Sequence, residues 1–147
     1  AAQFMPDEGE NRYLGVRFDL PSVADGDLNL VETRAQTIDV PAGPYDWLYR
    51  PTTTANSSKG AEALEVSYAD GTETVPFQVT DWCVAPKFGE IPIMRAAYRH
   101  ITLGVLKDAS PQIFLIKLPL DGGREIQSIT LPSTPTLYMV SMTLVRE

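Results

Sequence analysis

Short segments in which apolar and polar residues alternate, separated by turns rich in Pro, Gly and Asp, run through almost the whole chain. The pattern is present in residues 13–18 and 36–40, and it continues to residues 136–145. A period of two places successive side chains on opposite faces of a strand, whereas a helix repeats every 3.6 residues. Many short strands at intervals of about 8–12 residues predict an all-β fold, an antiparallel two-sheet β-sandwich of jelly-roll type.

The length of 147 residues is typical of one domain with its own core. Residues 1–12 are largely polar and are interpreted as a lead-in or linker segment. Residues 13–147 are interpreted as a single β-sandwich domain. Within it, the polar run over residues 52–60 predicts an exposed loop.

The clearest local prediction is a hairpin around Asp70 and Gly71. Apolar residues alternate on both sides of this pair, over residues 64–68 and 75–79. An Asp-Gly pair between two such runs favours a type I′ turn, because both central residues of that turn need a positive φ.

The acidic balance of the chain limits its partners. The net charge is −7 and the pI is about 4.7, so nucleic acid and anionic membranes are not expected partners, since phosphate binding needs clustered Lys and Arg. No apolar stretch reaches the roughly 18–20 residues of a membrane-spanning helix. Cys83 is the only cysteine, which excludes an internal disulfide framework and a multi-cysteine metal site.

The sequence contains no catalytic motif. His100 is the only histidine, no Gly-x-Ser-x-Gly elbow is present, and a zinc or copper site normally needs at least two His or Cys ligands. A small hydrolase would have to use a carboxylate pair such as Asp46 and Asp81, converging in one cleft about 5–10 Å apart. Whether the chain is an enzyme is left open, with a non-catalytic role preferred.

Calcium is the one metal that the sequence suggests. Asp25, Asp27 and Asn29 supply hard oxygen ligands in one loop, although their spacing is not that of an EF-hand. A structural calcium is therefore a candidate cofactor, and no other cofactor is expected.

Aromatic residues suggest sugar binding, which uses flat rings against the apolar face of a pyranose together with planar hydrogen-bonding groups. Tyr45, Trp47 and Tyr49 share one face of a predicted strand, and at least two of them are expected in the sandwich core. Trp82, in a loop rich in Pro and Gly, is the better candidate for an exposed platform. The candidate ligand-binding residues are Trp82, Trp47, Tyr98, Arg99 and Asn56.

A series of short motifs resembles a known family. In chain order they are Gly15-Val16-Arg17-Phe18, Gln36-Thr37-Ile38-Asp39-Val40-Pro41-Ala42-Gly43-x-Tyr45-x-x-Leu48, Tyr68-x-Asp70-Gly71-Thr72, Asp81-Trp82-Cys83, Tyr98-Arg99-His100 and Ile129-Thr130-Leu131-Pro132. The series is similar to the accessory β-sandwich domains of secreted bacterial glycoside hydrolases, of the galactose-binding-like jelly-roll type. The match spans most of residues 13–145.

The resemblance implies an extracellular or periplasmic module related to carbohydrate. It places Asp81, Trp82, Tyr98 and Arg99 at positions that match family motifs. We expect a non-catalytic carbohydrate-binding module that targets a polysaccharide or oligosaccharide and is part of, or partner to, a glycoside hydrolase. The alternative is a structural accessory domain that packs against a catalytic domain without binding sugar.

Overall fold

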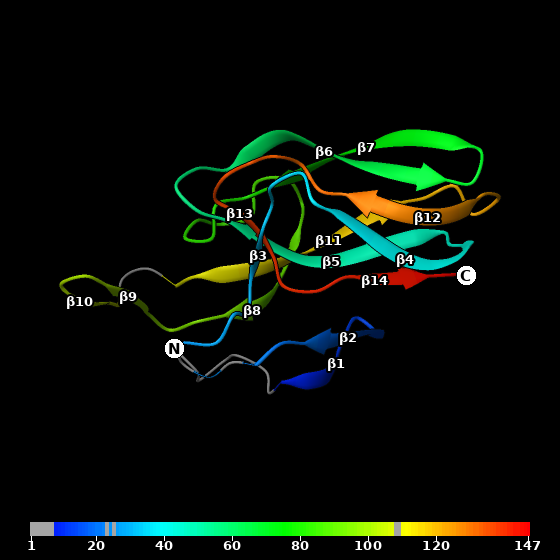
Figure 1. The fold of residues 1–147 in the computed structure, drawn as a ribbon. Coiled ribbons are helices and arrows are strands. Elements are labelled where there is room, and N and C mark those ends of the chain that lie inside the picture. Colours follow the sequence, from blue (N-terminus) through cyan, green and yellow to red (C-terminus); the bar gives the residue numbers. More distant parts are fainter. Residues whose placement is uncertain (1–7, 23, 25, 108–109) are drawn as a thin grey trace.

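Two antiparallel sheets face each other in the computed structural model, which describes residues 8–22, 24, 26–107 and 110–147 (Figure 1). The larger sheet has the order β3 (Val31–Glu32), β13 (Leu137–Met139), β5 (Trp47–Thr54), β11 (Gln112–Pro119) and β8 (Ile91–Arg95), with β14 (Thr143–Val145) also paired to β5. The smaller sheet has the order β4 (Thr37–Pro44), β12 (Glu125–Thr130), β6 (Lys59–Tyr68) and β7 (Gly71–Val79). The predicted all-β sandwich is confirmed.

Two ribbons complete the fold. β1 (Gly9–Tyr13) pairs with β2 (Val16–Leu20), and β9 (Arg99–Ile101) pairs with β10 (Gly104–Leu106). β1 begins inside the segment interpreted as a lead-in, because Gly9 pairs with Leu20. Of that segment, residues 1–7 lie outside the described part of the chain.

The main core lies between the two sheets, where alternate residues of the strands meet. Its fully buried members include Leu48, Phe114, Val66, Ile126 and Leu137. A second, smaller core lies on the other face of the larger sheet, where the β1–β2 ribbon brings Phe18 and Leu20 against Met94 and Leu115. The larger sheet is therefore packed on both faces.

β5 differs from its prediction in two ways. It extends through Thr52, Thr53 and Thr54, which were expected in a loop but are buried because β11 and β13 pair with this stretch. Of the Tyr-x-Trp-x-Tyr stripe, Tyr45 lies before β5 and packs against the main core, so it does not share a strand face with the other two residues. Leu48, which alternates with the stripe, is the fully buried residue there, whereas Trp47 and Tyr49 lie on the opposite face of the sheet and are half-buried.

The predicted hairpin is present as β6 and β7, but its turn is different. Tyr68 pairs with Gly71, so the two turn residues are Ala69 and Asp70, and neither has a positive φ. The type I′ prediction is therefore wrong. Gly71 instead supplies the positive φ, +151°, directly after the turn.

Candidate functional site

Trp82 is held at one end of β5 by its backbone. Its N–H donates to the Thr54 carbonyl oxygen at 2.9 Å, and its own carbonyl accepts the Gln112 N–H at 2.8 Å. Asp81 forms a parallel bridge with Thr54, and its carboxylate accepts the Cys83 N–H at 2.9 Å. The loop that carries Trp82 is thus fixed to the larger sheet.

Arg99, the first residue of β9, lies beside Trp82. Its guanidinium carbon lies 5.9 Å from the centroid of the Trp82 ring, and its Nε is buried without a hydrogen-bond partner among the described residues. Burial raises the pKa of the Cys83 thiol, whereas the positive charge of Arg99 lowers it and Asp81 raises it. A thiol with a raised pKa is a weak nucleophile at neutral pH.

Two other predicted ligand residues lie near this end of the sandwich. Asn56 is in the loop that joins β5 to β6, and Ser58 of that loop accepts the Asp81 N–H at 3.0 Å through its hydroxyl. Tyr98 directly precedes β9 and is half-buried. The structure therefore brings Trp82 and Arg99 together, with Asn56 on a neighbouring loop.

Trp47 lies at the opposite end of β5 from Trp82. It begins β5, whereas Trp82 is bonded to Thr54 at the other end of this strand. At about 3.3 Å per residue, seven residues separate these ends by about 23 Å. Lys117 also covers the Trp47 ring, with Nζ 3.7 Å from the ring centroid. Trp47 and Trp82 do not share one sugar platform.

The same geometry separates Asp46 and Asp81. Asp46 directly precedes β5, where its carboxylate accepts the Glu147 N–H, whereas Asp81 lies beside Thr54. Along β5 the backbone of Asp46 lies about 26 Å from that of Thr54, the residue beside Asp81, whereas paired acid catalysis needs carboxylates roughly 5–10 Å apart. This acid pair does not form an active site.

The calcium prediction has little support in the described residues. Asp25 lies outside them, and the backbone N–H of Asp27 donates to the Ala24 carbonyl at 3.2 Å. No group of three or more His, Cys, Asp or Glu side chains in the described part of the chain could hold a metal ion. Asn29 instead lines a pocket beside β3.

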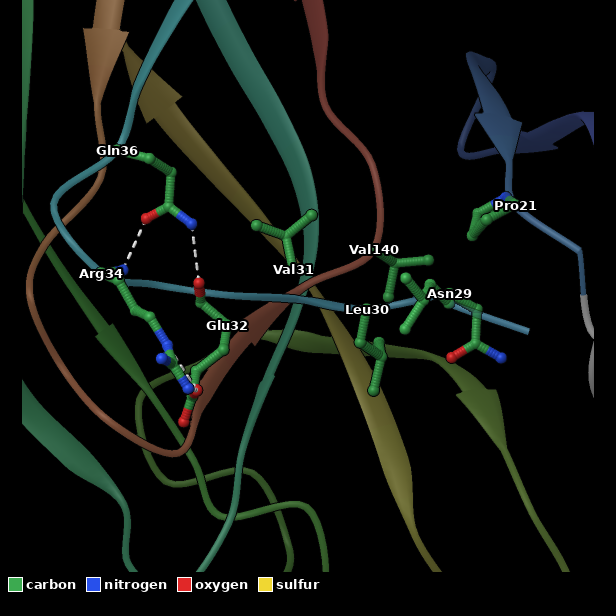
Figure 2. Close-up of a pocket in the computed structure, with 9 residues that line it drawn as sticks. Pro21, Asn29, Leu30, Val31, Glu32, Arg34, Gln36 and Val140 are labelled. Carbon is green, nitrogen blue, oxygen red and sulfur yellow. Dashed lines mark hydrogen bonds and ion pairs between the residues drawn. The ribbon is translucent and has the colours of Figure 1, made fainter. Parts of the chain in front are cut away.

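This pocket, called the β3 pocket below, has a volume of about 430 Å³. Figure 2 shows it at the edge of the larger sheet. Its apolar wall is formed by Pro21, Leu28, Leu30, Val31 and Val140. Its polar end is formed by Asn29, Glu32, Arg34 and Gln36. No aromatic ring lines it, so it is not a typical sugar site.

Leucine and valine side chains around the β3 pocket are unusually exposed. The exposed fraction is 97% for Leu28, 43% for Leu30 and 41% for Val31. The sequence analysis did not single out these residues, because they lie between a predicted loop and a predicted strand. The signal in the sequence was the group Leu28, Leu30 and Val31, three apolar residues within four positions directly after a loop rich in Asp and Gly.

The side chain of Gln36 covers the outer edge of β3. Its Oε1 accepts the Arg34 N–H, and its Nε2 donates to the Glu32 carbonyl oxygen at 2.8 Å (Figure 2). The carboxamide thus takes the place that a neighbouring strand would have. Because an open edge invites strand pairing, this contact makes the outer backbone groups of Glu32 and Arg34 less available to another strand.

Within the described part of the chain, no helix has the length and apolar character needed to cross a bilayer. No curated protein matches the chain in sequence. The family model of the AziU2-like beta-sandwich domain matches residues 1–147. This match agrees with the β-sandwich fold that the resemblance implied. It gives no support for a galactose-binding-like domain or for an association with glycoside hydrolases. The chain belongs to the AziU2-like β-sandwich domain family.

Proposed function

We propose that this protein is a non-catalytic accessory domain that packs against another protein through the β3 pocket. The observation that carries the proposal is the exposure of Leu28, Leu30 and Val31, which form the apolar wall of the pocket together with Pro21 and Val140. Apolar side chains gathered at one place on a soluble surface are typical of protein contact sites.

The β3 pocket has the composition of a protein interface. Apolar residues form one wall, and Glu32 pairs with Arg34 at the opposite end. A partner that inserts an apolar side chain would remove Leu30 and Val31 from water, which is the main source of favourable free energy in association. The polar end would form the hydrated rim that such interfaces usually have.

The two tryptophans support sugar binding less well. A cationic side chain lies over each ring, Arg99 over Trp82 and Lys117 over Trp47. Stacking on a pyranose needs a free ring face, so each cation would have to move before a sugar could bind on that face. A protein partner at the β3 pocket needs no such rearrangement.

The test uses the tagged chain as bait in an extract of its source cells, compared with the Leu30→Asp variant. Leu14→Asp is the matched control, because Leu14 is 69% exposed at the turn between β1 and β2. We expect mass spectrometry to identify one protein that the wild type and Leu14→Asp retain and that Leu30→Asp loses. If no protein shows this dependence, the proposal is rejected.

Carbohydrate binding is the second candidate, favoured by the contact between Arg99 and Trp82 and the nearby loop of Asn56. Its target would be a polysaccharide or oligosaccharide, and a partner glycoside hydrolase and an extracellular or periplasmic location would accompany it. Isothermal titration against a panel of polysaccharides tests it. Saturable binding that Trp82→Ala abolishes and Trp47→Ala retains would establish it, and an absence of binding by the folded protein would reject it.

A further inference from the structure

The β9–β10 ribbon projects from the sandwich and lacks support from the sheets. In the described part of the chain its strands pair only with each other (Figure 1). At its tip, Leu103 is 94% exposed, and Val105 on the returning strand is 44% exposed. The ribbon therefore presents a leucine to solvent, away from the core.

The base of the ribbon is anchored. Arg99, the first residue of β9, stacks over Trp82, whose backbone is bonded to β5 and β11. This contact restrains the base of the ribbon, which lowers the conformational entropy lost when its tip binds a partner.

Charge also distinguishes this part of the chain. Residues 82–107, which lie between Asp81 and Asp108, contain Lys87, Arg95, Arg99 and Lys107 but only one acid, Glu90, which gives this stretch a net charge of +3. Because the whole chain carries −7, the other residues together carry −10. The segment that bears the ribbon is thus complementary in charge to the rest of another copy of the same chain.

The chain therefore carries an exposed apolar projection, Leu103 at the tip of the β9–β10 ribbon, and a pocket with an apolar wall. Leu103 does not fill the pocket of its own copy, because it is almost fully exposed. We infer that two copies of the chain form a two-fold dimer in which Leu103 of each copy enters the β3 pocket of the other. This inference rests on the proposed function and names the partner at that pocket. A two-fold axis would bury both features of both copies at once, as in an isologous interface.

Sedimentation equilibrium of the full chain over a wide concentration range tests the dimer. We expect a reversible dimer for the wild type, weakened about 30-fold or more by Leu103→Asp and by Leu30→Asp, since each change places a charge at the centre of the interface. Leu14→Asp should dimerise like the wild type. Circular dichroism shows whether each variant is folded, and all three positions are exposed, so folding should be retained.

Mixing two variants provides a second test of the dimer. Leu103→Asp retains its pocket and Leu30→Asp retains its projection, so an equimolar mixture should form a heterodimer with one intact contact, which neither variant forms alone. In a Cys83→Ser background, Leu103→Cys mixed with Leu30→Cys should form an intermolecular disulfide when an oxidant such as diamide is added to accept the two electrons. A Leu14→Cys partner in place of Leu30→Cys should not.

The outcomes separate this inference from the proposed function. A wild type that stays monomeric at all concentrations, or a dimer that Leu103→Asp leaves unchanged, overturns the inference. If Leu30→Asp still loses a captured protein while Leu103→Asp retains it, the β3 pocket serves a different protein and the proposed function stands. If neither variant changes self-association or capture, both are rejected.

Discussion

The guanidinium carbon of Arg50 lies 3.9 Å from the centroid of the Phe77 ring, between the two sheets. Arg50 is 1% exposed, and its three guanidinium nitrogens have no hydrogen-bond partner among the described residues. Glu62 pairs with Phe77 across β6 and β7 and so shares its face of the sheet, but its carboxylate accepts the Thr134 hydroxyl at 2.6 Å. Burial lowers the pKa of Arg50 to about 9, and the charge of Glu62 raises it only in part.

We predict that Arg50→Met stabilises the protein. Replacing a buried, poorly paired charge by an apolar side chain of similar length often raises the free energy of unfolding, by about 1–4 kcal/mol. Because the pKa of Arg50 is lower in the folded state, the unfolded chain binds more protons above pH 9, and wild-type stability gains a contribution as the pH rises. The advantage of Arg50→Met should therefore shrink above about pH 9. Urea unfolding at several pH values measures both effects, and a variant less stable than wild type at pH 7 would contradict the prediction.

We predict that Gln36→Ala weakens the edge of the larger sheet. It removes the two hydrogen bonds that the carboxamide makes to Arg34 and Glu32, at about 1 kcal/mol each. The Arg34 amide should exchange its hydrogen faster, and the urea midpoint should fall. Gln36→Glu is the control, because it retains the acceptor for the Arg34 N–H and loses only the donor to Glu32. Equal exchange of the Arg34 amide in wild type and Gln36→Ala would show that the carboxamide does not cap this edge.

The all-β fold and the hairpin of β6 and β7 could be predicted because alternation is a local property. The end of β5 could not. Thr53 and Thr54 are buried because their hydroxyls donate to the Gln112 and Ser57 carbonyls, and because β13 pairs with them. Partners up to 59 residues away satisfy these polar groups, so a threonine run resembles a loop when only its neighbours in sequence are known.

The candidate site shows the same limit. Alternation correctly placed Trp47 and Tyr49 on one face, but it could not tell which face of β5 meets the other sheet. Nor could it tell that β5 is long enough to hold Trp47 and Trp82 at opposite ends. The β3 pocket was missed because it joins Pro21 and Val140, which are far apart in the sequence, to the run at residues 28–31.

We predict that Arg99→Gln slows the reaction of Cys83 with a disulfide reagent such as Ellman's reagent. The positive charge of Arg99 lowers the pKa of the Cys83 thiol against the effect of burial, so its loss raises the pKa and reduces the thiolate fraction at a given pH. Cys83 is the only cysteine, so the signal reports this thiol alone. Arg95→Gln is the control, because Arg95 bonds to Gln112 instead. A rate profile in which both variants match the wild type would contradict the effect of Arg99.

The carboxylate of Glu90 holds the loop over residues 81–90. Its two oxygens accept the N–H groups of Thr80 at 2.6 Å and Phe88 at 2.9 Å. Burial pushes the pKa of Glu90 upward, but the hydrogen bonds from Thr80 and Phe88 outweigh this and hold it below its ordinary value. Glu90→Gln retains one acceptor oxygen, so we expect it to lower the free energy of unfolding by about 1–2 kcal/mol at pH 7.

The pH dependence of this loss has a definite sign. A carboxyl group whose pKa is lower in the folded state stabilises the fold above its unfolded pKa and loses that contribution as the pH falls through the folded value. The difference between wild type and Glu90→Gln should therefore be constant near neutral pH and vanish in acid. Glu65→Gln is the matched control, because Glu65 is an exposed strand residue. A difference that persists unchanged at low pH would show that the glutamine disturbs packing, and that the charge of Glu90 does not hold the loop.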